Sequence, residues 1–128
     1  AHAGRSWIDA DRYVTGVPEL AVEVAASTTA YDVREKRQMY ERVGVQEYLV
    51  WQTEHERIDW WELREGAYVP LPADDQGIIR SRVFPGLWLH VPALLADDLV
   101  RVMATLQQGI ASPEHAAFVE AISRSAEE

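Results

Sequence analysis

The sequence predicts one domain of the α+β or mixed α/β class. Its elements follow the order strand, helix, several strands and two final helices, which favours a sheet packed against helices. The 128 residues fit one domain better than two, and 48% of them are hydrophobic, which is enough for a packed core. The composition therefore argues against disorder as a description of the whole chain.

The first strand and the first helix follow a polar, turn-prone segment at residues 8–16. The strand is predicted at residues 18–26, and apolar residues on both of its faces indicate an interior strand covered on both sides. The helix is predicted over residues 31–43, because Gly44 follows it where a left-handed C-cap is favoured.

The rest of the chain is predicted to contain short strands and then helices. One helix begins after Pro92, has apolar residues at helical spacing and stops at Gly109. Ser112 is expected to cap the last helix, which runs to about Arg124. The strands are expected at residues 46–51, 58–63, 67–71, 78–83 and 87–91.

Lys36 is the candidate functional residue of the first helix, and it is the only lysine beside eleven arginines. A helical wheel places it on the buried face, where an unpaired ammonium is costly. Its expected partner is Glu23, which stands on an apolar strand face between the small residues Ala21 and Ala25. Glu23 lies about 10 Å before the end of its strand. If the helix folds back over this face of the sheet, Lys36 lies about 7 Å back from the helix start, at a similar height. The lysine stem can close the remaining gap, so we expect the two groups to meet.

The same wheel divides the other residues of this helix. Asp32, four residues before Lys36, lies at the same edge. The buried face is predicted to hold Val33, Met39, Tyr40 and Val43. The solvated face is predicted to hold Arg34, Arg37, Gln38, Glu41 and Arg42.

Each of these signals has an alternative interpretation. A Glu23–Lys36 pair can be purely structural, and Lys36 can also reach solvent past a short helix end. The adjacent Trp60 and Trp61 either stack on nucleic-acid bases or, more commonly, pack against the core and a sheet face. The four histidines lack metal-ligand spacing, which favours surface or local roles.

Three segments resemble a known family by their order across a strand, a helix and a strand. They are PELAVEV at 18–24, YDVREK at 31–36 with Tyr40 after it, and GV-EY at 44–48. With the later stretch 80–87, they make the chain resemble the Uma2 family, also called DUF820. These are restriction-endonuclease-like proteins of the PD-(D/E)XK superfamily.

The resemblance implies a fold and an organisation for the chain. It implies a restriction-endonuclease-like core, with a central mixed sheet flanked by helices, over residues 17–95. Residues 1–16 are then a lead-in, and residues 96–128 form a C-terminal helical extension.

The resemblance also implies a metal-dependent endonuclease that hydrolyses DNA phosphodiester bonds with Mg²⁺ or Mn²⁺. In that superfamily an Asp and a Glu bind the cation, and a lysine aligns or activates the attacking water. Carried over, Glu23 is the metal-binding acid and Lys36 is the lysine, moved from the strand to the helix. Asp32 matches a helix-start aspartate with an orienting role. Tyr40 matches an aromatic residue that packs against the site.

One departure from the family pattern concerns the second acid. The family's first metal-binding aspartate lies in a Pro-Asp pair on the strand before that of Glu23, and this chain contains no Pro-Asp pair. Pro18-Glu19 is not a substitute, because it belongs to the Glu23 strand itself. Since the chain begins with Ala1, we expect that an N-terminal part of the fold is missing and that the chain as given does not cleave nucleic acid.

Charge and hydropathy limit the partners of the chain. The net charge of −9 argues against a nucleic-acid clamp held by charge alone, so a partner or assembly is expected to supply basic surface. The apolar stripe of residues 94–106 and the Trp60-Trp61 hairpin predict a homodimer. No apolar run approaches the roughly 20 residues that span a bilayer, so we expect no membrane partner and a cytoplasmic location. The rival hypothesis is a non-catalytic interaction protein that keeps the fold.

Overall fold

The computed structural model describes residues 4–26 and 30–127. They form two compact units, a sheet unit at Gly4–Leu71 and a second unit that begins at Pro72. Both units combine strands with helices, which confirms the mixed class predicted from the element order. No helix of the described ranges is both long and apolar enough to cross a membrane.

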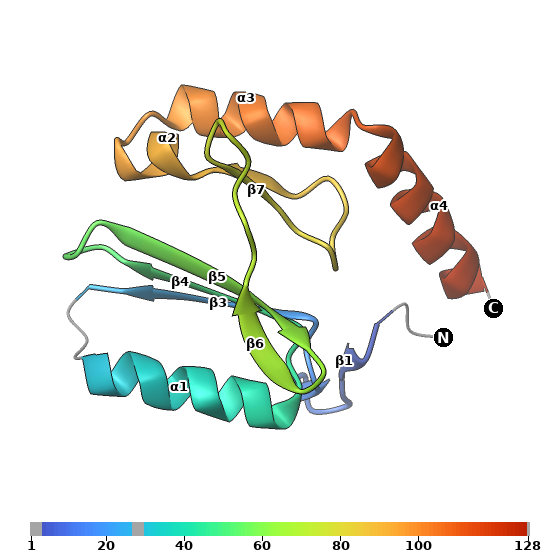
Figure 1. The fold of residues 1–128 in the computed structure, drawn as a ribbon. Helices are drawn as coiled ribbons and strands as arrows, with labels where there is room; N and C mark the ends of the chain where they lie inside the picture. Colours follow the sequence, from blue (N-terminus) through green and yellow to red (C-terminus); the bar gives the residue numbers. More distant parts are fainter. Residues whose placement is uncertain (1–3, 27–29, 128) are drawn as a thin grey trace. The chain divides into compact units, whose positions relative to one another are not determined.

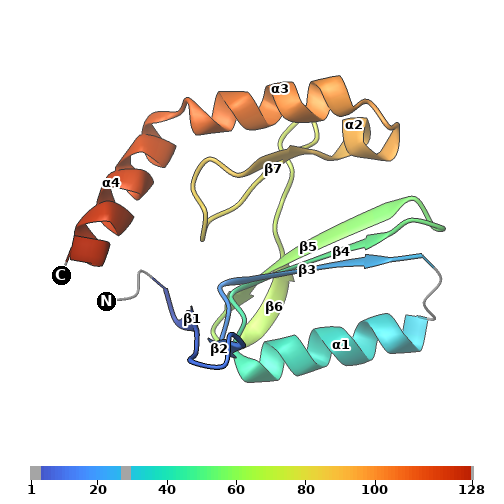
Figure 2. The same ribbon diagram turned by 180° about the vertical axis from the view of Figure 1, so that it is seen from behind.

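The sheet unit is built on one four-stranded mixed sheet in the order β3-β4-β5-β6. The helix α1 connects the parallel strands β3 and β4 and covers one face of the sheet (Figure 1, and from behind in Figure 2). The remaining neighbours are antiparallel, as expected for strands joined by tight turns. The elements are β3 (Leu20–Ala25), α1 (Ala30–Val43), β4 (Glu47–Gln52), β5 (Arg57–Arg64) and β6 (Ala67–Pro70).

The strand β3 is an edge strand of this sheet, not an interior strand. On the face away from α1, Val22 is 59% exposed and Val24 is 61% exposed. The prediction of a strand covered on both sides is therefore wrong. Valine favours strands because its branched side chain suits a pleated surface, so an apolar alternation does not by itself show that both faces are covered.

The inward face of α1 is more polar than the wheel predicts. The guanidinium of Arg37 lies over the ring of Trp61, and Glu41 accepts a 2.8 Å hydrogen bond from a backbone N–H of β6. Met39 is 45% exposed and Val43 is 54% exposed, although both belong to the predicted buried face. The assignment of these four residues is wrong, because the aromatic surface of the sheet packs well against long polar side chains.

Two short strands occupy the segment predicted as a lead-in. The antiparallel pair β1 (Ser6–Ile8) and β2 (Val14–Gly16) forms a hairpin. The prediction that residues 8–16 are only a polar, turn-prone segment is therefore wrong. Asp9 holds its turn, accepting hydrogen bonds from two backbone N–H groups and from the Thr15 hydroxyl at 2.9 to 3.0 Å. Because these bonds favour the charged carboxylate, the pKa of Asp9 is lowered. Hydropathy misses such a turn because polar side chains stabilise it.

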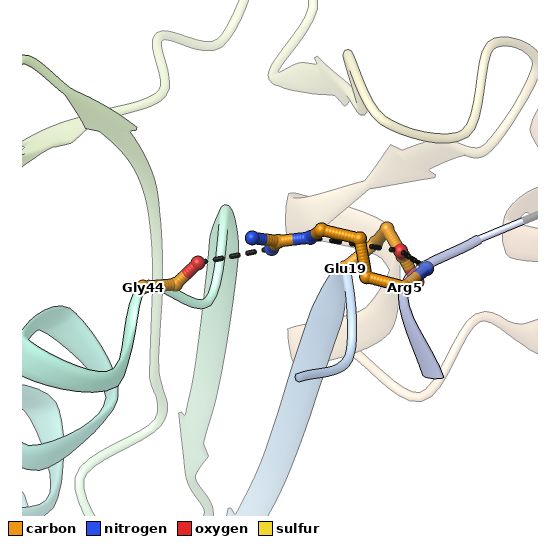
Figure 3. A network of polar contacts seen from close by, with 3 residues as sticks. All are labelled: Arg5, Glu19 and Gly44. Carbon is orange, nitrogen blue, oxygen red and sulfur yellow. Dashed lines mark hydrogen bonds and ion pairs between the residues drawn. The ribbon is translucent and has the colours of Figure 1, made fainter. Parts of the chain in front are cut away.

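Arg5 links this hairpin to the sheet and to the end of α1 (Figure 3). Its backbone N–H donates to Glu19 at 2.6 Å, and its guanidinium donates to the Gly44 carbonyl at 3.0 Å. Gly44 has a φ of +94°, which confirms the predicted left-handed end of the helix. A cation at this point also complements the negative end of the helix dipole.

The second unit contains a two-stranded sheet and three helices. The predicted helix after Pro92 is divided in two, because Asp98 accepts a hydrogen bond from the backbone N–H of Arg101 and caps a new helix. The predicted cap of the last helix is confirmed, since the Ser112 hydroxyl accepts from the N–H of His115 at 3.3 Å. The elements are β7 (Ile78–Arg80), β8 (Trp88–His90), α2 (Val91–Leu95), α3 (Leu99–Ile110) and α4 (Pro113–Glu127).

Gly109 lies inside α3 and does not end it, so the predicted helix stop is wrong. A Cβ atom at this position would lie 2.2 Å from the backbone oxygen of Gly86 and 2.8 Å from the Trp88 ring. Glycine is therefore required here by close packing between α3 and the segment before β8. Helix stops and packing glycines look alike in a sequence.

Candidate functional site

Glu23 and Lys36 meet across the contact between β3 and α1. The Lys36 ammonium donates a hydrogen bond to Oε1 of Glu23 and forms an ion pair with it. The flanking residues Ala21 and Ala25 are small, which leaves room above the strand for the lysine stem. The predicted contact is confirmed. Both side chains keep solvent access, with 21% of Glu23 and 42% of Lys36 exposed.

Tyr48 of β4 is a third member of this site. Its hydroxyl donates a 3.3 Å hydrogen bond to Oε2, the second carboxylate oxygen of Glu23. The parallel register places Tyr48 beside Ala21, so the phenol extends past the alanine toward Glu23. Burial and the charge of Glu23 raise the pKa of Tyr48, so its hydroxyl stays protonated and remains a donor.

Aromatic rings surround Tyr48 on the α1 face of the sheet. Tyr40 of α1 lies 4.9 Å from it between ring centroids, and Trp61 of β5 stacks on it at 5.7 Å. Tyr68 of β6 lies at 6.3 Å and donates a 2.7 Å hydrogen bond to the Val45 carbonyl. Burial raises the pKa of Tyr68 to about 12. Tyr48 is fully buried in this cluster, so its hydroxyl is held in a fixed position next to the Glu23 carboxylate.

The other predicted site residues differ in what the structure shows. Tyr40 does pack beside the site, through its contact with Tyr48. The backbone of Asp32 lies in the first turns of α1, but its side chain is outside the described residues. The orienting role of Asp32 stays a prediction, as do the chemical roles of Glu23 and Lys36.

A cation site needs more ligands than Glu23 supplies here. Among the residues whose side chains are described, no group of three His, Asp or Glu lies close enough to hold a metal ion. Glu19 is engaged by Arg5, and Asp9 closes the hairpin turn. Both oxygens of Glu23 already accept hydrogen bonds from protein groups. The described residues therefore do not fit a divalent cation that prefers six or more oxygen ligands.

The sequence pattern did not single out Tyr48, Arg37 or the orientation of Trp61. One signal existed: residues 48, 61 and 68 are aromatic and occupy neighbouring strands, where cross-strand aromatic pairs are common. Trp60, on the opposite face, is only 3% exposed and donates to Glu47 at 3.0 Å. Both tryptophans thus pack within the protein, in agreement with the more common of their two interpretations.

The family model Uma2, described as "Putative restriction endonuclease", matches residues 2–92. The chain belongs to the Uma2 family. The mixed sheet with its crossover helix is consistent with a restriction-endonuclease-like fold. No curated protein matches the chain.

Membership in Uma2 confirms the resemblance seen in the sequence and indicates a nuclease-like function. The match begins inside residues 1–16, where the structure has its hairpin. The predicted boundaries at residues 17 and 95 stay a prediction.

Proposed function

We propose that this Uma2 domain acts on phosphodiester bonds of DNA, with Glu23 and Lys36 at the centre of the site. One observation carries this proposal: an accessible carboxylate–ammonium contact in a nuclease-like family, at the two positions that the resemblance in the sequence implies. Structural ion pairs gain little from solvent access, whereas a reacting group needs it.

The residues of the site suit phosphoryl chemistry in distinct ways. The Lys36 ammonium carries three donors on a flexible stem, so it can turn from Glu23 to a phosphate oxygen and stabilise charge that develops there. Tyr48 holds the second oxygen of Glu23, so the carboxylate keeps its orientation when Lys36 turns away. The buried aromatic rings make the base of the site rigid, which preserves this geometry.

Mg²⁺ or Mn²⁺ remains part of the proposal, with Glu23 as one ligand. The described side chains do not complete a cation site, so further ligands would come from outside the described residues. We therefore propose that residues 1–128 alone bind the cation weakly and do not cleave DNA. Lys36 should compete with the cation, because both are attracted to the same carboxylate oxygen.

The test is a Mn²⁺ titration followed by electron paramagnetic resonance, which measures the free ion. We expect wild-type protein to bind Mn²⁺ with a dissociation constant on the order of millimolar, as for cation sites with few charged ligands. Lys36→Met should bind more tightly, because the competing ammonium is removed. Glu23→Ala should lose the binding. Glu120→Ala, an exposed acid of α4, is the matched control.

Equal Mn²⁺ binding by wild type, Lys36→Met and Glu23→Ala would overturn the role of Glu23. A nuclease assay with Mg²⁺ and with Mn²⁺ is the second arm, with Lys36→Ala as its control. Cleavage by residues 1–128 that disappears in Lys36→Ala would support the nuclease function. It would show that the account of the incomplete cation site is wrong.

A second candidate function is a non-catalytic interaction protein that keeps the nuclease-like fold. The observation in its favour is that each oxygen of Glu23 already has a protein donor, as in a structural ion pair. This candidate predicts no Glu23-dependent Mn²⁺ binding in any variant, so the same titration separates the two.

Self-association and location extend the proposal. We propose a homodimer, because α3 presents Leu99, Val100 and Met103 at exposures of 61%, 83% and 51%. Sedimentation velocity at micromolar concentration tests this, and a single monomeric species would contradict it.

A domain that acts on DNA works where DNA is present, so we propose a cytoplasmic location.

A further inference from the structure

A cavity of about 720 Å³ lies beside the Glu23–Lys36 site, between α1 and the sheet. Its lining includes Arg34 and Arg37 of α1 and Arg57, Asp59 and Trp61 of β5. The cavity is connected to the site through the aromatic cluster, since Trp61 stacks on Tyr48 and Tyr48 contacts Glu23. Three arginines around one cavity are unusual in a chain whose net charge is −9.

The charges of the cavity do not cancel. Arg57 donates two hydrogen bonds to Asp59, at 2.7 and 3.2 Å, so these two groups neutralise each other. Asp59 raises the pKa of Arg57, which keeps this pair ionised. Within the described part of the chain, neither Arg34 nor Arg37 has a carboxylate partner. Two positive charges therefore remain at the cavity.

Trp61 serves to position Arg37. The guanidinium carbon of Arg37 lies 5.1 Å from the centroid of the Trp61 ring, a distance typical of a cation–π contact. Tyr48 stacks on the same ring at 5.7 Å. Because protein groups already occupy the ring, a nucleic-acid base gains little by stacking there. The contact holds Arg37 at the cavity with its N–H groups available to an anion.

We propose that Arg34 and Arg37 form a site for a phosphate group carried by a nucleic-acid strand or by a free nucleotide. This inference rests on the proposed function, which it deepens by naming how the acidic chain contacts its substrate. Guanidinium groups match the planar arrangement of phosphate oxygens and bind them with two hydrogen bonds. Lys36 points to Glu23 on β3 and Arg37 to Trp61 on β5, so the cavity and the candidate reaction centre lie on the same side of the sheet, with Tyr48 of β4 between them.

The size of the cavity restricts the ligand. A volume of about 720 Å³ lies in the range of pockets that enclose drug-sized molecules. One or two nucleotides of a strand match this volume. The site should therefore contact one or two consecutive phosphates of its ligand.

The experiment measures binding of a fluorescent single-stranded oligonucleotide by anisotropy, without cation, so that cleavage plays no part. Arg34→Ala and Arg37→Ala should each weaken binding about tenfold, the effect of one charge-assisted hydrogen bond. Each should also lower the slope of the logarithm of affinity against the logarithm of salt concentration by about 1. Arg42→Ala is the matched control, because Arg42 is exposed on the same helix and does not line the cavity. It should bind as wild type.

A second arm identifies the source of the phosphate. Calorimetric titration with inorganic phosphate and with a mononucleotide should show binding that both variants lose. If these small ligands bind but the oligonucleotide does not, the site belongs to a free nucleotide, and the proposal holds with that ligand. Melting curves of each variant establish that the fold is intact.

The proposal is overturned if Arg34→Ala and Arg37→Ala bind all three ligands as Arg42→Ala does. That result would leave the nuclease proposal standing, because the Mn²⁺ titration of Glu23 variants is independent of it. Conversely, loss of Glu23-dependent cation binding with the arginine effects intact would leave a phosphate-binding domain without nuclease chemistry.

Discussion

Glu23 and Glu47 lie on opposite faces of the four-stranded sheet, and they differ in exposure and in the partner that they contact. Glu23 lies on the face covered by α1, with 21% of its side chain exposed, and it contacts the ammonium of Lys36. Glu47 lies on the opposite face, is fully buried and accepts a 3.0 Å hydrogen bond from the indole N–H of Trp60. The register pairs Glu47 with Leu20, three residues from Glu23 along β3.

The difference shows how to separate a functional carboxylate from a structural one. A fully buried carboxylate is costly without hydrogen bonds, so Glu47 is fixed by the packing around it. Glu23 is reached by solvent, and its cationic partner can move. Both residues lie in strands that are otherwise mostly apolar, so hydropathy alone does not distinguish them, whereas the three-dimensional environment does. The two faces should therefore respond differently to substitution.

The largest loss of stability is expected from substitution of Tyr48, whose hydroxyl donates a hydrogen bond to Glu23. Tyr48→Ala should lower the free energy of unfolding by about 3–5 kcal/mol, because a fully buried aromatic ring that contacts three others is removed. Tyr48→Phe keeps the ring and loses only the hydrogen bond to Glu23, so it should lose about 0.5–1.5 kcal/mol. Chemical denaturation measures both. Equal losses would show that the ring packing is unimportant.

A smaller effect is expected at Glu47. Glu47→Ala should lower the free energy of unfolding by about 1–3 kcal/mol, because the buried indole N–H of Trp60 loses an acceptor. Glu47→Gln keeps an acceptor oxygen and should retain most of the stability. If Glu47→Ala unfolds at the wild-type denaturant concentration, the structural role given to this face is wrong.

The tyrosines of the α1 face predict a dependence on alkaline pH. The pKa of Tyr68 is raised to about 12, and an unfolded tyrosine titrates near 10. The stabilisation from its buried neutral form is therefore complete below pH 10 and is lost as the pH rises toward 12. Denaturation midpoints measured from pH 9 upward should fall. Tyr68→Phe should make this fall smaller, while the raised pKa of Tyr48 keeps part of it, and a profile identical to that of wild type would contradict the assignment.

The Glu23–Lys36 contact could be predicted from the sequence because two regular geometries determine it. The strand rise and the helix rise bring the residues to the same height, and a small residue on each side of Glu23 leaves space. The helix end at Gly44 and the Ser112 cap were predictable for a similar reason, since each depends on local chemistry at one position.

Features that depend on long-range packing could not be predicted in this way. Gly109 reads as a helix stop until the backbone of Gly86 is placed against it. The helical wheel assigns Arg37 to the solvated face of α1, and only the position of Trp61 on β5 shows that its guanidinium packs on an aromatic ring. In each case the deciding neighbour is distant in the sequence. Periodicity reports only whether a residue is apolar, and an arginine over an aromatic ring is buried in part without being apolar.

The smallest effect is expected for the Glu23–Lys36 pair itself, and it sharpens the comparison most. Both side chains are accessible, so Glu23→Gln and Lys36→Met should each change the free energy of unfolding by less than about 1 kcal/mol. A double-mutant cycle should give a coupling energy in the same range. Glu23→Gln keeps the size of the side chain and an acceptor for Tyr48, so it isolates the charge.

Losses near 3–5 kcal/mol in the single variants Glu23→Gln and Lys36→Met would have a different meaning, because losses of that size arise when one partner of a buried ion pair is removed. Glu23 would then be a structural residue like Glu47, and the non-catalytic candidate would gain support. A small coupling energy, together with Glu23-dependent Mn²⁺ binding, would show that the contact is maintained at little benefit to the fold. Stability would then not explain why an acid and a lysine occupy this solvent-accessible position, whereas chemistry on a phosphate would.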